Sequence, residues 1–177
     1  MAEITNQVIL DNLTAQFGEI AHSLNEPWGP MSIRIPPEKN VEVIQFLRDD
    51  AGLQFSFLTT LCGVHYPERK EKFDIVYHLH SWVNSIRLRI KCSVAGEPPH
   101  VQSLVSVFKC ANWMERETYD FFGIIFDGHP NLKRILNVDD MTIFPMRKEY
   151  PLEDNTRIDK DDTMFGRDEN PFYQHLR

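Results

Sequence analysis

Three histidines stand close together in the sequence and raise the question of a metal site. His78 and His80 are two residues apart in an apolar run, so a strand would project both rings from one face, and His65 lies upstream. No Asp, Glu or Cys stands at a short spacing that would support a ligand set. Packing or hydrogen bonding of the rings is therefore the favoured interpretation, and a small metal-dependent hydrolase is the alternative.

A second group of ionisable residues is acidic and comprises Glu115, Glu117 and Asp120, with Arg116 among them. Paired carboxylates can act as general acid and base where a cleft shifts their pKa values. Nothing nearby supplies a nucleophile, oxyanion donors or a phosphate-binding loop. The spacing of Arg116 and Asp120 predicts instead an ion pair between helical positions i and i+4. Catalysis by this chain alone is not expected.

The stretch from Asp127 to Pro130 has two interpretations. His129 on a loop could act as a general base, or Gly128 could simply permit a tight turn with positive φ. Beyond it, the basic pairs Lys133–Arg134 and Arg147–Lys148 are short and are separated by apolar residues. Mixed apolar and cationic residues on an extended segment suit a groove on another protein better than a nucleic-acid duplex.

Composition limits the class of protein. The chain has 177 residues and a formal net charge of −7, which argues against nucleic-acid binding, because a nucleic-acid-binding protein needs a basic surface. No apolar run approaches the roughly 20 residues that cross a bilayer. Cys62, Cys92 and Cys110 are odd in number and widely spaced, so we expect small buried side chains rather than disulfides or an iron–sulfur cluster.

The first half of the chain predicts helices and strands that would position these groups. Apolar spacing predicts an amphipathic helix over 4–20 and a second helix from Pro36 to Gly52, with a short strand at 31–35 between them. Strands are predicted over 55–60, 73–81 and 86–93, with a hairpin loop at 82–85. We therefore expect an α/β fold of the α+β type, in which helices flank a small mixed or antiparallel sheet. One face of this sheet would be covered and the other basic and solvated.

The second half is less regular. A short helix is predicted over 101–108, and Asn112 followed by Glu115 has the spacing of a capping box that would begin a helix ending at Gly123. Beyond Phe126 the pattern ends and 146–152 looks extended, so the chain divides into a globular domain, 1–126, and an extended partner-binding segment, 127–177. The acidic stretch from Glu153 has few large apolar residues and cannot bury much surface by itself.

The run from Asn112 to Leu136 closely resembles a family signature, ERExYDxFGIxFxGHPxLxRIL, of the C subunit (30 kDa type) of proton-pumping NADH:quinone oxidoreductase, respiratory complex I. The segment 146–152 is similar to the family's LRKDYPL element, and 66–69 and 73–79 are similar to its first hairpin. The resemblance covers roughly 53–152. Two departures are His65, where the family often has an acidic residue, and Phe144-Pro145, where it often has Gly-His.

The resemblance implies a cofactor-free, non-catalytic subunit of the hydrophilic arm, with FMN and iron–sulfur clusters in partner subunits. Its partners would be the large quinone-site subunit (D type) and neighbouring iron–sulfur subunits, on the cytoplasmic side of the bacterial inner membrane. Related membrane-bound hydrogenases and photosynthetic complexes, or an unrelated acidic adaptor, are the alternatives.

The same resemblance, together with the mixed composition of the second half, gives the candidate partner contacts. For one of them, Arg147, we expect substitution by Ala to weaken assembly and to leave the melting temperature of the isolated chain almost unchanged. The candidate residues are Glu115, Arg116, Glu117, Tyr119, Asp120, Phe122, Gly123, Gly128, His129, Pro130, Arg134, Arg147, Lys148, Tyr150 and Pro151.

Overall fold

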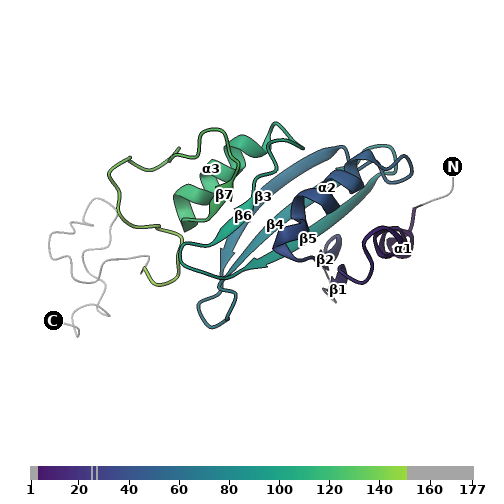
Figure 1. Ribbon diagram of the computed structural model, residues 1–177, viewed down its shortest axis with the longest axis horizontal. Coiled ribbons are helices and arrows are strands. Elements are labelled where there is room, and N and C mark those ends of the chain that lie inside the picture. Colours follow the sequence, from purple (N-terminus) through teal and green to yellow (C-terminus); the bar gives the residue numbers. More distant parts are fainter. Residues whose placement is uncertain (1–3, 25, 27, 151–177) are drawn as a thin grey trace, which may run out of the picture.

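The computed structural model describes residues 4–24, 26 and 28–150 (Figure 1). A five-stranded sheet with the order β1-β2-β5-β4-β3 forms its centre, and β6 and β7 pair in a small second sheet. In chain order the elements are α1 (Asn6–Phe17), β1 (His22–Leu24), β2 (Met31–Arg34), the 3₁₀ turn η1 (Pro37–Lys39), α2 (Asn40–Asp49), β3 (Phe57–His65), β4 (Phe73–Ser81), β5 (Ile86–Val94), β6 (His100–Gln102), α3 (Ala111–Phe122) and β7 (Ile125–Asp127).

The central sheet is mixed, which is one of the two arrangements that the sequence allows. β3, β4 and β5 form an antiparallel meander, and β2 runs parallel to β5. The alternation along β5 carries over directly, since Leu88, Ile90 and Cys92 are buried while Arg87 is exposed. The α+β fold and the hairpin turn at 82–85 are therefore confirmed.

Helices α2 and α3 cover one face of this sheet (Figure 1). α2 contributes Val43, Ile44 and Leu47 to the same core as Ile90. α3 crosses β3 at Gly63, where an added Cβ would lie 2.8 Å from the Phe122 ring and 3.1 Å from Thr118. A glycine at this point lets the helix approach the strand closely. The aromatic end of α3 is thereby packed onto the sheet.

Two predictions for the second half are wrong. Residues 101–108 do not form a helix, because Val101 pairs with Phe126 of β7 and the chain then turns through 104–108. Asn112 and Glu115 do not form a capping box, because α3 begins earlier, with Cys110 as its N-cap, and Glu115 turns toward the protein interior. The proposed boundary after Phe126 also falls inside β7, Ile125–Asp127.

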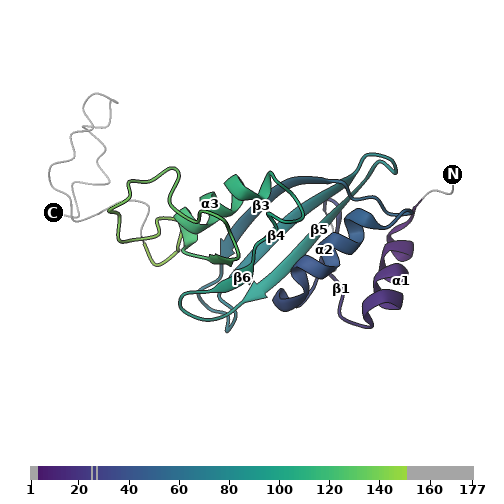
Figure 2. The ribbon, with the colours of Figure 1, turned by 45° about the horizontal axis from the view of Figure 1, so that its top comes forward.

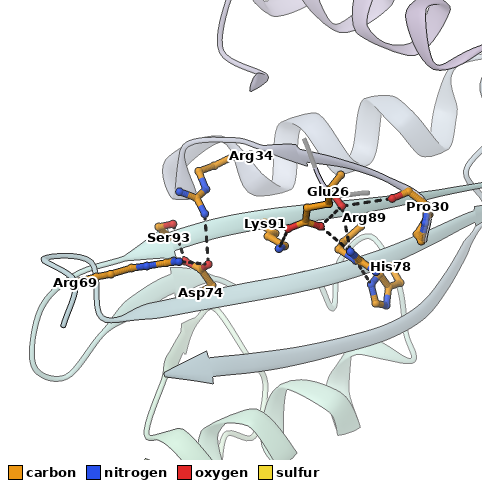
Figure 3. Close-up of polar contacts among 10 residues, drawn as sticks. Glu26, Pro30, Arg34, Arg69, Asp74, His78, Arg89, Lys91 and Ser93 are labelled. Carbon is orange, nitrogen blue, oxygen red and sulfur yellow. Dashed lines mark hydrogen bonds and ion pairs between the residues drawn. The ribbon is translucent and has the colours of Figure 1, made fainter. Parts of the chain in front are cut away.

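The face away from α2 and α3, here called the open face, carries the basic residues of β5 together with two carboxylates that partly neutralise them (Figure 3). Glu26 accepts hydrogen bonds from Arg89 (2.7 Å), Ser32 (2.6 Å) and Lys91. The bond from Lys91, and then that from Ser32, hold the Glu26 pKa low, at about 2. The prediction of a basic second face is thus confirmed, with an acidic residue from outside the sheet folded onto it.

Asp74 forms the second cluster of the open face and is 1% exposed. It accepts a hydrogen bond from Ser93 (2.7 Å) and pairs with Arg69 (3.2 Å) and Arg34 (3.5 Å), as Figure 3 shows. Each of the two carboxylates therefore faces two cations, and the open face keeps an excess of positive charge on a chain whose net charge is −7.

Candidate partner-binding site

The segment from Gly128 to Tyr150, here called the arm, is held against α3 by the carboxylate of Asp120. This side chain is fully buried, and its Oδ2 accepts the backbone N–H groups of Ile135 (3.1 Å), Leu136 (2.8 Å) and Asn137 (2.9 Å). Three consecutive amides that converge on one oxygen form a small anion-binding concavity. Burial alone would raise the Asp120 pKa, but the hydrogen bonds from Asn137 and Leu136 outweigh it, so the net shift is downward.

Arg134 completes this anchor from the side of the arm. Its Nη1 donates to the Asp120 carboxylate at 2.7 Å, and its Nη2 donates to the carbonyl oxygens of Met141 (2.7 Å) and Ile143 (3.1 Å). The guanidinium group therefore ties two parts of the arm to α3. The predicted pair between Arg116 and Asp120 is wrong, because Arg116 instead donates to the carbonyl oxygens of residues 133 (3.1 Å) and 134 (3.0 Å).

Arg147 forms a second anchor near the end of the described arm. Its Nε donates to the carbonyl oxygen of Phe122 at 2.7 Å, and its Nη1 donates to Glu97 at 2.8 Å. The guanidinium group lies 5.1 Å from the centre of the Phe73 ring and 4.9 Å from that of Phe144. With only 7% exposure, Arg147 is part of this chain's own interior. The expectation that its removal leaves the isolated chain's stability unchanged does not agree with these contacts.

The junction between α3 and the rest of the chain is Gly123. It is the C-cap of the helix, as predicted, in the left-handed conformation with φ of 74°. An added Cβ would stand 2.5 Å from the Phe144 ring of the arm. Gly123 thus satisfies two requirements at once, a left-handed helix end and close contact with the arm, and Tyr119 packs edge-on against the same ring at 6.1 Å between centroids.

Glu115 lies on the inner side of α3 and is fully buried. Its two carboxylate oxygens accept hydrogen bonds from the Ser103 hydroxyl (2.6 Å) and the Leu104 backbone N–H (2.6 Å). Burial raises the Glu115 pKa to about 7, and the two hydrogen bonds only partly oppose this shift. In the fold, this residue joins α3 to the turn after β6.

The structure places His129 in the tight turn that the sequence predicts. The turn closes through a hydrogen bond from the backbone N–H of His129 to the Phe126 carbonyl oxygen (3.1 Å), with Gly128 at φ of 83°. The ring accepts the Asn131 N–H at Nδ1 (3.0 Å), so its Nε2 carries the proton and donates to the Asn112 carbonyl oxygen (3.1 Å). Both ring nitrogens are therefore occupied by backbone contacts.

The three histidines singled out above each have different neighbours, although His78 and His80 lie on the same face of β4. His65 accepts the Lys148 backbone N–H (3.0 Å) and stacks on Phe73, while His78 accepts from Arg89 at 2.8 Å. His80 packs beside the Trp82 ring, with 4.5 Å between centroids. Over 4–24, 26 and 28–150, no group of three His, Cys, Asp or Glu is placed to hold a metal ion.

The cysteines are all free thiols, but only one has the predicted environment. Cys92 is buried in the core, whereas Cys62 and Cys110 lie at the surface. The predicted burial is therefore confirmed for Cys92 and wrong for Cys62 and Cys110. Cys62 is exposed because β3 is an edge strand and this side chain faces the open side of the sheet.

The candidate residues thus fall into two groups. Glu115, Asp120, Phe122, Gly123 and Arg147 are buried within this chain. Glu115 binds the turn after β6, whereas the next three contact the arm and Arg147 anchors the arm from within it. The others are partly or fully exposed and remain predicted partner contacts, while Pro151 lies outside the described residues. The exposed or partly exposed candidates are Arg116, Glu117, Tyr119, Gly128, His129, Pro130, Arg134, Lys148 and Tyr150.

The arm also carries exposed apolar side chains that are absent from the candidate set. Leu136 and Val138 are each 64% exposed, Met146 is 56% and Ile143 is 39% exposed. These apolar residues stand in the sequence beside Arg134 and Arg147, whose side chains turn inward. This proximity in the sequence is the feature that could have identified them. Residues 146–150 of the arm form a turn, in which the Tyr150 N–H donates to the Arg147 carbonyl oxygen at 3.1 Å. The prediction of an extended chain is therefore wrong for these residues.

Comparison with known proteins gives consistent results. A model of the family "Respiratory-chain NADH dehydrogenase, 30 Kd subunit" matches residues 33–156. The C subunit 2 of NADH-quinone oxidoreductase from Rhizobium meliloti (strain 1021) is 44% identical over 146 residues, which is 82% of this chain and 79% of that protein. The C subunit of the same enzyme from Roseiflexus sp. (strain RS-1) is also 44% identical, over 84% of this chain and 86% of its own length.

Two solved structures share the fold. A trypsin-resistant fragment of Nqo5 superposes with a TM-score of 0.60 at 28% identity, covering 71% of this chain and 98% of the fragment. A chain of the membrane-bound sulfane sulfur reductase, an archaeal respiratory membrane complex, gives a TM-score of 0.71 at 18% identity over 88% of this chain and 95% of its own. Within the described part of the chain, no helix has the length and hydrophobicity for a membrane crossing. The chain belongs to the family of the 30 kDa subunit of respiratory-chain NADH dehydrogenase.

Proposed function

We propose that this chain is a non-catalytic structural subunit of NADH–quinone oxidoreductase that binds its neighbours through the arm. The observation that supports this most is the orientation of the arm: Arg134 and Arg147 turn inward onto α3, while a set of apolar side chains faces solvent, namely Leu136, Val138, Ile143 and Met146. Groups of exposed apolar side chains commonly mark protein interaction sites. The names of the relatives favour NADH–quinone oxidoreductase over the hydrogenase and photosynthetic alternatives.

In this proposal the redox reaction is carried out by other subunits of the complex. FMN and iron–sulfur clusters in partner subunits carry electrons from NADH to quinone, coupled to proton translocation, and this chain holds neither. Its candidate carboxylates support that division, since Glu115 and Asp120 are fully buried and engaged in structural hydrogen bonds. The partner of the arm would be the large quinone-site subunit, with iron–sulfur subunits beside it, on the cytoplasmic side of the membrane.

The two anchors make the arm suited to this task. Because Asp120, Arg134 and Arg147 fix the backbone of the arm, its exposed side chains are held in one arrangement before any partner arrives. Binding a rigid surface costs less conformational entropy than ordering a loose segment, so more of the contact energy appears as affinity. The exposed residues Leu136 and Val138, next to the Asp120 anchor, are the expected centre of the contact.

The test is a pull-down of the complex from membranes through a tag on this chain. The double variant Leu136→Asp, Val138→Asp introduces charge where the partner would bury apolar surface. We expect recovery of the large quinone-site subunit to fall about ten-fold or more, because each 1.4 kcal/mol of lost binding free energy is a factor of ten. The melting temperature of the isolated chain should change little, because both side chains are exposed.

Val8→Asp is the matched control, since Val8 is 41% exposed on α1, away from the arm. It should leave recovery of the subunits unchanged. Normal recovery with the double variant, or equal losses with the control, would show that the arm is not the docking surface.

A further inference from the structure

A second group of exposed apolar side chains, this one rich in aromatic rings, lies at the β4–β5 turn. Trp82 is 64% exposed, Val83 is 56% and Phe57 is 42% exposed. The rings form one cluster, since the Trp82 centroid lies 5.8 Å from that of Phe57 and 4.5 Å from that of His80. With Arg87, these residues are here called the hairpin-end patch. Nothing in the fold requires such large apolar side chains in solvent, because the core beneath is filled by Leu58 and Leu79.

The register of the sheet brings a cation into this patch. Phe57 pairs with His80, and His80 with Arg87, so the three side chains form one row across the open face. The next row contains Arg89, and Lys91 follows two residues further along β5. Arg87 is exposed and, among the described residues, makes no ion pair. The patch therefore combines aromatic surface with available positive charge, a combination enriched at the energetic centres of protein interfaces.

The hairpin-end patch and the arm occupy opposite ends of β3. The arm reaches the strand at His65, which accepts the Lys148 N–H, whereas the patch begins at Phe57. At about 3.3 Å per residue, the strand separates them by roughly 25 Å. Figure 2 shows the arm and the β4–β5 turn toward opposite ends of the long axis. A partner that binds the arm therefore does not have to contact the hairpin-end patch as well.

We propose that the hairpin-end patch is a second docking surface, which binds an acidic segment of another protein subunit. The charge of the patch argues for this partner, because carboxylates would pair with Arg87 while apolar side chains beside them would cover Trp82 and Phe57. The chain would then bridge two neighbours, one at the arm and one at the patch. This inference does not depend on which protein the arm binds.

Two other occupants fit the charges less well. A second copy of this chain would bring one cationic patch against another, and like charges that face each other disfavour association. An anionic membrane would attract the patch but repel the whole chain, whose net charge is −7. A local acidic region on a protein avoids both difficulties.

The direct experiment places a photo-reactive phenylalanine analogue, p-benzoylphenylalanine, at position 82 of the full-length chain in cells that assemble the complex. A second strain carries it at position 136 in the arm. After irradiation, cross-linked peptides are identified by mass spectrometry. We expect position 82 to link to an acidic peptide of another subunit, at a site different from the one that position 136 reaches. Adducts only to this chain, to lipid or to the site reached from position 136, or the absence of any adduct, would overturn the proposal.

A charge variant provides an independent measurement. Arg87→Glu should lower recovery of the position-82 partner about ten-fold or more and leave the arm's partner in place. Lys70→Glu is the matched control, because Lys70 is also exposed but lies in the β3–β4 loop at the other end of the strands. Equal recovery with Arg87→Glu and wild type overturns the proposal. Binding of the wild-type chain, and not of Arg87→Glu, to phosphatidylglycerol vesicles would assign the patch to a membrane instead.

Discussion

Two buried carboxyl groups of this protein each join two segments of the chain. Asp120 joins α3 to the arm, and Glu115 joins α3 to the turn after β6. The pKa values of the two carboxyls shift in opposite directions. Asp120 receives three amides, an Arg and an Asn, which stabilise its anion, whereas Glu115 receives only two donors. Burial raises the pKa of both carboxyls, and the number of donors decides whether the net shift is upward or downward.

Glu115 should make the stability of the chain depend on pH. Its pKa rises from an ordinary 4.5 to about 7 on folding, so the native state binds the proton more tightly than the unfolded state. The protonated form is therefore the stabilising one, and the free energy of unfolding should decrease as pH rises from 4.5 to about 7. At about 1.4 kcal/mol per pH unit, the decrease should approach about 3 kcal/mol.

Glu115→Gln removes this titration while keeping groups that can bond to Ser103 and Leu104. Urea unfolding at pH 5 and at pH 7.5 should show the variant gaining stability relative to wild type at the higher pH. Parallel pH profiles for the two proteins would contradict the raised pKa. Other groups that titrate in this range are present in both proteins, so the difference between the profiles isolates Glu115.

At the scale of elements, α3 and the arm are packed together, and Gly123 is the point at which they are in closest contact. Gly123→Ala should cost about 1–2 kcal/mol for the left-handed backbone, and about 1–3 kcal/mol more because the Phe144 ring lies 2.5 Å from the new Cβ. Gly128→Ala is the control, since φ is 83° there and no atom lies within 4 Å. Thermal unfolding should rank Gly123→Ala as clearly less stable than Gly128→Ala. Equal losses would mean that the ring moves aside freely.

Much of the element pattern could be predicted from the sequence, and the failures share one cause. The strands β4 and β5 and the helix end at Gly123 follow from local alternation and from glycine chemistry. Residues 101–108 resemble a helix by spacing, but Val101 pairs with Phe126, which lies 25 positions further along the chain. Similarly, Asp120 pairs with Arg134 and not with the nearer Arg116. Contacts between distant segments decided these cases, and spacing does not encode them.

The candidate site shows the same division. Sequence reasoning singled out the residues that hold the arm, because they belong to a dense run of charged and aromatic side chains, but it assigned them to partner contacts. It did not find Leu136 and Val138 or the hairpin-end patch, because exposure depends on which face of a folded segment turns outward. A lone apolar residue in a loop carries no such information until the anchoring bonds are known.

For the molecule as a whole, Arg147 joins the arm to two other parts of the chain. It links the arm to the last carbonyl oxygen of α3 and to Glu97 after β5. Arg147→Ala should therefore lower the unfolding free energy of the isolated chain by about 2–4 kcal/mol, because a buried carbonyl and a carboxylate lose their donor. It should also make the arm more sensitive to limited proteolysis. Lys148→Ala, at an exposed neighbouring position, should leave both measurements near wild type. An unchanged melting temperature for Arg147→Ala would refute the anchor.

The three amides that converge on Asp120 also bear on the order of events during biogenesis. Their donors, residues 135–137, follow α3 closely in the chain, so the bend can form as soon as this stretch leaves the ribosome. The bend at residues 135–137 would then be in place before the Arg147 anchor, ten residues further along the chain, is made.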